Sequence, residues 1–288
     1  MTIKIVTDSS CDLGIDFVKK NNIEFVPLLL NLDGENIEDD LGKSLGYREF
    51  YDKLREGSMP STSQINIYTF EEKFRKLLNE GYEILYVGLS SALSGTFNSA
   101  NMARNNILEE NPNAKISVVD SLSVSMGVGM LVKKSCDMIE EGKDLEYITT
   151  WIEENKNKVI HSILVDDLKH LKRGGRISAS TAAVGSLLNI KPILKIDNNG
   201  AVEATEKIKG KKKALKYLAT VVKEKALNIE SETLYIMHGD ALEEAQALKD
   251  IILQELNFKE IKIQYIGTVI GSHGGPGTIA TLFWGNER

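Results

Sequence analysis

Residues 83–100 read EILYVGLSSALSGTFNSA, a stretch that joins a strand to a helix through a polar loop. Residues 83–87 are a short apolar run rich in strand formers, as expected of a buried parallel strand. From Phe97 onward, apolar residues recur at helical spacing. The loop between them therefore lies where open α/β sheets usually bind their ligands, at the carboxyl end of a strand.

The loop itself has the features of an anion site. Ser94 is the expected N-cap, Gly95 allows a ligand to approach the backbone, and the first free N–H groups of the helix point at the site. A simpler interpretation is that Ser94 only caps the helix and the other hydroxyls face water. The loop alone does not decide between the two.

Similar hydroxyl-rich segments occur at residues 7–12 (TDSSCD) and 59–64 (MPSTSQ). The first follows a strand predicted at 3–6, and a further strand is expected at 24–30. Thr69-Phe70-Glu71-Glu72 has the pattern of a capping box and predicts a helix start. Alternating strands and helices predict a mainly parallel, helix-flanked sheet.

The second half of the chain has a different pattern. Strands at 191–196 and 201–208 flank Asp197-Asn198-Asn199-Gly200, which predicts an antiparallel hairpin and an α+β domain. A length of 288 residues favours two domains at roughly 150 residues each. The most linker-like segment is 155–158, so we expect an α/β domain over 1–157 and an α+β domain over 158–288.

Residues 267–277 (GTVIGSHGGPG) place five glycines around His273, which predicts a tight loop. An imidazole there donates one or two hydrogen bonds, according to its protonation. The alternative is a histidine that merely faces solvent in a turn. Together with the loop hydroxyls, His273 suits a carboxylate or phosphate head group.

Composition excludes several functions. A net charge of -6 argues against a dedicated nucleic-acid binder, and two cysteines, Cys11 and Cys136, fit a reducing compartment such as the cytoplasm. The N-terminus lacks a signal-peptide pattern, and no apolar run is long enough to span a membrane. Transient contact with a membrane surface remains compatible with the sequence. The four histidines are scattered, so we expect neither a metal nor a cofactor.

Two groups of basic residues stand out. Arg173 and Arg176 surround Gly174-Gly175, and docking of a partner and an ordinary surface role are equally open for them. The run Lys209 to Lys213 precedes a predicted helix, against the helix dipole, and its simplest interpretation is a solvated face.

Five motifs, in this order and spacing, resemble those of the DegV family of bacterial lipid-binding proteins over nearly the whole chain. They are TDSS at 7–10, PSTSQ at 60–64, SSALSGT at 90–96, KRGGR at 172–176 and IGSHGGPG at 270–277. The resemblance implies two α/β domains with a long-chain fatty acid between them, its tail buried and its carboxylate held by hydroxyls. In related fatty-acid-binding subunits the carboxylate is presented to a separate kinase, which makes an acyl-phosphate for lipid synthesis. The resemblance therefore implies a carrier and not the catalyst.

The resemblance also implies roles for individual residues. Thr62 and Ser94 match the direct carboxylate donors and His273 a third, whereas Arg173 and Arg176 match positions thought to contact the kinase. The supporting ligand loops contain Ser63, Gly95, Thr96, Ser9 and Ser10.

Three expectations remain less specific. The apolar helix expected at 178–188 is a candidate wall of the tail channel. An enzyme acting on a small phosphorylated or carboxylated metabolite, with His273 or Asp8 as acid or base, is the main alternative function. A nucleic-acid partner for the run Lys209 to Lys213 is a third, and it predicts steep salt dependence.

Overall fold

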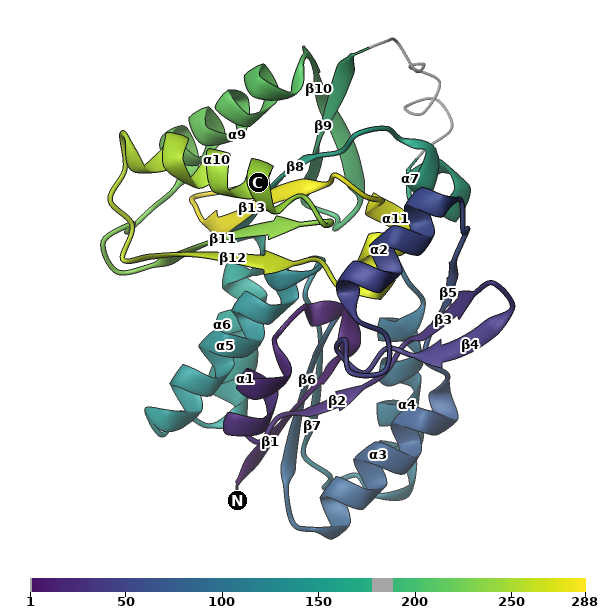
Figure 1. The fold of residues 1–288 in the computed structure, drawn as a ribbon. Helices are drawn as coiled ribbons and strands as arrows, with labels where there is room; N and C mark the ends of the chain where they lie inside the picture. The colour runs from purple at the N-terminus through teal and green to yellow at the C-terminus, as the bar shows by residue number, and fades with distance from the viewer. Residues whose placement is uncertain (1, 178–188) are drawn as a thin grey trace.

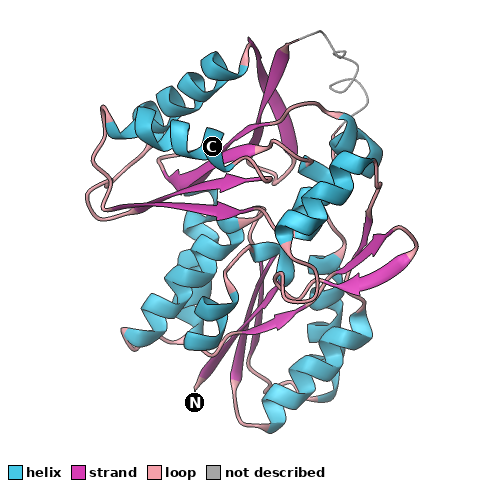
Figure 2. Cartoon of the chain, viewed as in Figure 1, coloured by secondary structure: helices cyan, strands magenta, loops and turns pink. Residues whose placement is uncertain are grey.

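The computed structural model describes residues 2–177 and 189–288. They form a mixed α/β structure with one parallel sheet, one larger mixed sheet and a small antiparallel sheet (Figures 1 and 2). The predicted fold class is confirmed. The strands of the two larger sheets lie on opposite sides of the domain boundary predicted after residue 157, and that boundary stays a prediction.

The parallel sheet has the order β2-β1-β6-β7, and every pairing in it is parallel. Its strands are β1 (Ile3–Asp8), β2 (Glu24–Val26), β6 (Glu83–Gly88) and β7 (Ile116–Asp120). The helices that connect and cover it are α1 (Ile15–Lys20), α3 (Ile67–Asn79), α4 (Thr96–Glu110), α5 (Met126–Glu140) and α6 (Leu145–Asn155). β1 and β6 are neighbours, so the loops that follow them meet at one edge of the sheet.

Helices cover both faces of this sheet. α3 and α4 pack on one face through Phe70, Phe74 and Ala103, and α5 and α6 cover the other (Figure 1). α5 is apolar nearly all round, because its other side packs against Tyr235 and Leu282 of the larger sheet. This helix therefore joins the cores of the two sheets.

The larger sheet has the order β10-β9-β8-β13-β11-β12. Its strands are β8 (Val159–Leu164), β9 (Ile190–Ile196), β10 (Val202–Lys209), β11 (Thr233–His238), β12 (Glu260–Tyr265) and β13 (Ile279–Trp284). Only β11 and β12 are parallel; the other neighbours run antiparallel, including the predicted β9–β10 hairpin. α9 (Lys211–Lys225) and α10 (Leu242–Leu253) cover its outer face, whereas α7 (Lys169–Gly174) and α11 (Thr268–Gly274) lie at its inner end (Figure 1).

A third sheet corrects the strand expected at 24–30. The segment divides around Pro27 into β2 and β3 (Leu29–Leu32), because proline supplies no ladder donor and redirects the chain. β3 pairs with β4 (Glu35–Glu38) across the Asp33-Gly34 turn, and with β5 (Ser61–Ser63). β5 follows α2 (Tyr47–Glu56), and its pairing with β3 places Thr62 opposite Leu30.

Three other local predictions differ from the structure. α3 begins at Ile67 with Asn66 as its cap, since the Asn66 side chain accepts from the Thr69 N–H at 2.9 Å. The predicted loop around His273 is α11, and β13 after it was not predicted. The helix expected at 178–188 lies outside the described residues. Within the described part of the chain, no helix combines the length and apolarity needed to cross a membrane.

Candidate ligand-binding site

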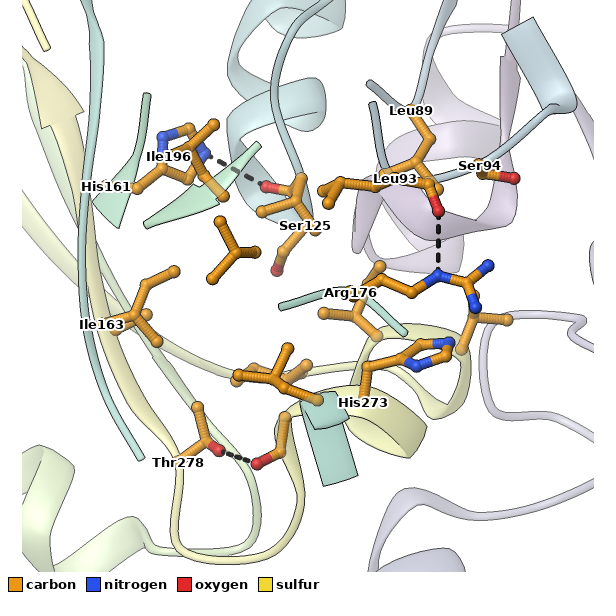
Figure 3. Close-up of a pocket in the computed structure, with 18 of the residues that line it drawn as sticks. Leu89, Leu93, Ser94, Ser125, His161, Ile163, Arg176, Ile196, His273 and Thr278 are labelled. Carbon is orange, nitrogen blue, oxygen red and sulfur yellow. Dashed lines mark hydrogen bonds between the residues drawn. The ribbon is translucent and has the colours of Figure 1, made fainter. Parts of the chain in front are cut away.

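A cavity lies between the two larger sheets, and apolar side chains form most of its wall (Figure 3). The empty volume of this cavity is about 910 Å³, including the part that is open to solvent. The apolar wall comes from loops of the parallel sheet, from strands of the larger sheet and from α11: Leu28, Leu89, Leu93, Ile163, Val165, Leu194, Ile196, Val269, Ile270, Ala280 and Leu282.

Polar side chains gather at one side of this cavity. Ser94, Arg176 and His273 lie together there, and His161 and Ile196 lie on the opposite side (Figure 3). Thr62, Ser63 and Gln64 of the segment around β5 line the same cavity. A mainly apolar space with polar side chains gathered at one end suits an amphipathic ligand.

Thr62 and His273 are in direct contact. Thr62 Oγ1 lies 2.9 Å from His273 Nε2, which joins β5 to the last turn of α11. The ring fits there because its neighbour is Gly174, where a Cβ atom would stand 2.3 Å from His273 Nδ1. Gly174, the first glycine after Arg173, thus makes room for the imidazole.

His273 is neutral at neutral pH. Burial, and then the positive charges of Arg176 and Arg173, lower the pKa of His273 to about 4. Its Nδ1 atom is buried and has no hydrogen-bond partner among the described residues. The contact with Thr62 is therefore the one polar interaction that the described structure gives this ring.

Ser94 differs in detail from the prediction. α4 begins at Thr96 with Gly95 as N-cap, one residue later than expected, because Ser94 turns its hydroxyl to Thr96. Ser94 Oγ lies 3.0 Å from Thr96 Oγ1 and accepts from the Thr96 N–H at 3.3 Å. Thr96 is buried and accepts from the Ile65 N–H at 3.3 Å, so it supports Ser94 from behind the cavity wall.

The arginines hold the polar end together. Arg176 donates to Leu93 O at 3.0 Å and to Gly174 O, which places a cation on the cavity wall. Arg173 reaches Pro60 O at 3.5 Å and Ser272 O at 3.4 Å, so it links β5 to α11. Of the two, Arg176 lines the cavity.

Ser9 and Ser10 are not brought to the cavity. Ser9 Oγ accepts from the Leu28 N–H at 3.1 Å, and Ser10 donates to Asp8. Asp8 is fully buried and accepts from Tyr86 at 2.8 Å and from the Leu89 N–H at 2.9 Å. This segment positions the loop after β6 and does not line the cavity.

Sequence reasoning missed most of the cavity wall. His161, Ser125 and Thr278 line it, and the sequence analysis did not single them out as site residues, although Ser125 belongs to the serine-rich segment 121–125. Within the described ranges, no group of three or more His, Cys, Asp or Glu side chains is arranged to hold a metal ion. In the run Lys209 to Lys213, Lys211 pairs with Glu244 at 3.0 Å and with Asp166 at 3.5 Å.

Comparison with known proteins agrees with this architecture. Residues 2–285 match the family model described as "Uncharacterised protein, DegV family". A DegV domain-containing protein of Clostridium perfringens is 44% identical, and the alignment covers 99% of this chain and 98% of that protein.

Two solved structures are also similar. One is a fatty-acid-binding DegV family protein of Thermus thermophilus, with 33% identity, a TM-score of 0.89, and coverage of 99% of this chain and 100% of that one. The other is a DegV family protein of Eubacterium eligens loaded with heptadecanoic acid, with 27% identity and a TM-score of 0.84. That comparison covers 99% of this chain and 100% of the other.

Proposed function

This chain belongs to the DegV family, and we propose that it binds a long-chain fatty acid, such as palmitate, in the cavity between its two larger sheets. The acyl tail lies among the apolar side chains, and the carboxylate lies at the end formed by Thr62, Ser94 and His273. The observation that carries the proposal is a mainly apolar cavity in which Thr62, Ser94, Arg176 and His273 gather at one end.

The hydrogen bonds at the polar end leave two hydroxyl protons for a ligand. When the neutral His273 carries its proton on Nε2, it donates to Thr62 Oγ1, and the Thr62 hydroxyl proton is free. When Thr96 donates to Ser94, the Ser94 proton is free in the same way. Both then donate to a carboxylate, and the Arg176 cation favours its negative charge.

The tail supplies most of the affinity. At about 0.8 kcal/mol per buried methylene, roughly fourteen methylenes give on the order of 11 kcal/mol, against association costs of about 4 to 15 kcal/mol. Each neutral hydrogen bond adds only about 0.5 to 1.5 kcal/mol. Thr62 and Ser94 therefore orient the carboxylate more than they drive binding.

We further propose that the protein is a carrier that presents this carboxylate to a separate kinase, which forms an acyl-phosphate for lipid synthesis. Ser63 and Gln64 are exposed beside the cavity, and Arg173 is exposed near them, which supports a partner at this opening. Arg173 and Arg176 are the proposed contacts for that partner. Asp8, the acid considered for an enzyme, is enclosed by four donated hydrogen bonds, from Ser10 N–H, Ser10 Oγ, Tyr86 and Leu89 N–H.

The test of fatty-acid binding is native mass spectrometry of the purified protein, followed by organic extraction of anything bound. We expect a mass increment that matches a long-chain fatty acid recovered in the extract. A protein that carries no lipid and also fails to bind added palmitate would overturn the proposal.

Presentation to a kinase is tested separately, with a fatty acid kinase from a related bacterium. Thr62→Val is expected to keep palmitate bound with modestly reduced affinity and to lose most acyl-phosphate formation. Full acyl-phosphate formation by a variant that lacks both the Thr62 and Ser94 hydroxyls would exclude the assigned roles.

A further inference from the structure

The larger sheet is incompletely paired beside the cavity. β8 and β9 are antiparallel neighbours, but their ladder contains two residue pairs, Ile163 with Leu194 and Leu164 with Ile193. The next positions in register, Ser162 with Lys195 and His161 with Ile196, are not paired. The two described strands therefore form no ladder at residues 160–162 and 195–196.

A second cavity lies on the other face of the sheet at this point. The space between its atoms amounts to about 450 Å³, and it is bounded by β8, β9, β10 and α9. Side chains alternate between the two faces of a strand, so Ile160, Ile193 and Lys195 face α9, whereas Ile163 and Leu194 face the main cavity. Three residues nevertheless line both cavities: His161, Leu194 and Ile196.

These three residues form the wall between the two cavities. Leu194 and Ile196 are almost fully buried, at 1% and 0% exposure. The His161 ring lies between Val159 O, 3.2 Å from Nδ1, and Val124 O, 3.3 Å from Nε2. It packs against Gly127 in the first turn of α5, where a Cβ atom would stand 2.2 Å from Nε2.

This wall lies opposite the polar end. His161 and Ile196 face Arg176 and His273 across the main cavity (Figure 3). A fatty acid whose carboxylate is at Ser94 and His273 therefore points its methyl end toward the unpaired part of β8 and β9.

We propose that the gap between β8 and β9 is a passage through the sheet, and that the second cavity receives the methyl end of acyl chains too long for the main cavity. The proposal rests on the proposed function, because it assumes a fatty acid with its carboxylate at the polar end. It identifies Leu194, Ile196 and His161 as the residues that set acyl-chain length.

The chemistry of the second cavity suits hydrocarbon better than an anion. Its lining includes Ile160, Ile193, Val221 and the ring of Tyr217, beside the polar side chains of Ser162, Thr205 and Lys225. Of its basic residues, Lys195 pairs with Glu203 at 3.1 Å. The Arg288 guanidinium donates to four carbonyls and the Ser123 hydroxyl: Leu122 O, Lys156 O, Val159 O, Asp197 O and Ser123 Oγ.

The experiment compares the affinities of palmitate, stearate, arachidate and behenate for the full chain and three variants. Val221→Phe fills the second cavity from α9, on the side away from the main cavity. Ile196→Ala opens the wall between the cavities. Thr220→Phe adds the same bulk to the exposed face of α9 and is the matched control.

Each buried methylene changes affinity by about a factor of four. We expect Val221→Phe to weaken arachidate and behenate at least tenfold and to leave palmitate within about twofold, since two displaced methylenes are worth about fifteenfold. We expect Ile196→Ala to shift the preference toward the longer acids, and Thr220→Phe to match the unmodified chain.

The outcomes separate the two proposals. If palmitate binds and the chain-length profile of Val221→Phe equals that of Thr220→Phe, the passage is excluded and the proposed function stands. If no fatty acid binds the unmodified chain, both proposals fail. If Val221→Phe does not fold, the profile of Ile196→Ala decides, and an unchanged preference there overturns the passage.

Discussion

The loops after β1 and β6 have similar sequences and opposite roles. Both are rich in hydroxyls, and both follow neighbouring parallel strands, at 9–12 and at 89–95. The loop after β6 places Ser94 on the cavity wall. The loop after β1 is buried, and its hydroxyls bond to its own surroundings.

Carboxylates explain the difference. The loop after β1 contains Asp8 and Asp12, and Asp39 lies beside it. Asp8 accepts from Ser10, and Asp12 accepts from Ser125 and from the Gly267 N–H at 3.0 Å. The buried carboxylates accept the donors of the loop after β1, so this loop is tied to its own surroundings, whereas Ser94 of the loop after β6 lines the cavity.

The largest expected effect is the pH dependence of stability at Asp12. Burial raises the pKa of Asp12 from 3.8 to about 8, against the hydrogen bond from Ser125. A carboxyl group whose pKa is higher in the folded than in the unfolded protein stabilises the folded state at pH values below its unfolded-state pKa. This stability is lost as the pH rises through its folded-state pKa. At about 1.4 kcal/mol per unit, the loss by pH 9 is on the order of 5 kcal/mol.

Urea unfolding at pH 5 and pH 9 measures the part of this loss that falls between the two pH values, about 4 kcal/mol. The free energy of unfolding of the unmodified chain is expected to fall relative to that of Asp12→Asn as the pH rises. The exposed Asp16→Asn is the control and should follow the unmodified chain. If the free energies of unfolding of Asp12→Asn and the unmodified chain changed with pH in the same way, the pKa of Asp12 would not be raised in the folded protein, and the prediction would fail.

The next effect is the loss of an internal acceptor. Asp8→Ala leaves the Tyr86 hydroxyl and the Ser10 and Leu89 N–H groups buried without their partner. We expect it to lower the free energy of unfolding by about 4 kcal/mol in urea titrations. Asp8→Asn keeps one acceptor oxygen and should lose less; equal losses would mean that the hydrogen bonds of Asp8 contribute little.

A smaller effect is expected from the hydroxyls of the cavity. The double variant Thr62→Val with Ser94→Ala should weaken palmitate binding by about 1 to 3 kcal/mol, since each hydrogen bond contributes about 0.5 to 1.5 kcal/mol. Its thermal unfolding should stay close to that of the unmodified chain, because both side chains are only partly buried. Calorimetric titration with palmitate measures the affinity. If the double variant lost as much stability as Asp8→Ala, its two hydroxyls would serve the fold and not only the cavity.

The smallest expected effect is at His273. Because the pKa of His273 is lowered to about 4, its ring should stay neutral in the ligand-free protein from pH 8 down to pH 6. NMR titration of the histidine ring signals, assigned with His273→Gln, measures this. A signal for His273 that titrates near pH 6.5 would show that the ring is exposed and not tied to Thr62.

The sequence predicts the elements of this fold well where local signals decide them. The Asp33-Gly34 turn adopts positive φ at both residues and forms the β3–β4 hairpin, and Asp144 caps α6 through the Tyr147 N–H at 2.8 Å. Both features depend on neighbouring residues alone. The alternating order of strands and helices predicts the parallel sheet for the same reason.

The sequence predicts the site less completely. Motif resemblance identifies Thr62, Ser94 and His273, which line one cavity. The burial of Ser9 and Ser10 depends on contacts from distant segments, since Leu28 N–H donates to Ser9 and Tyr86 and Leu89 donate to Asp8, the partner of Ser10. α11 was predicted as a loop because its glycines weigh against helix, and close packing overrides this preference: a Cβ at Gly271 would lie 2.4 Å from the Tyr51 hydroxyl. The apolar wall comes from many separate segments, and no local pattern marks it.

The position of β13 has a consequence for how the protein is made. β13 lies between β8 and β11, although it follows β12 in the chain. During synthesis, the parallel sheet is complete once β7 has emerged, while β8 and β11 wait for residues 279–284 to join them. The strands of the N-terminal sheet are therefore all available before those of the larger sheet, and the cavity wall is complete only once the residues of α11 and β13 have been synthesised.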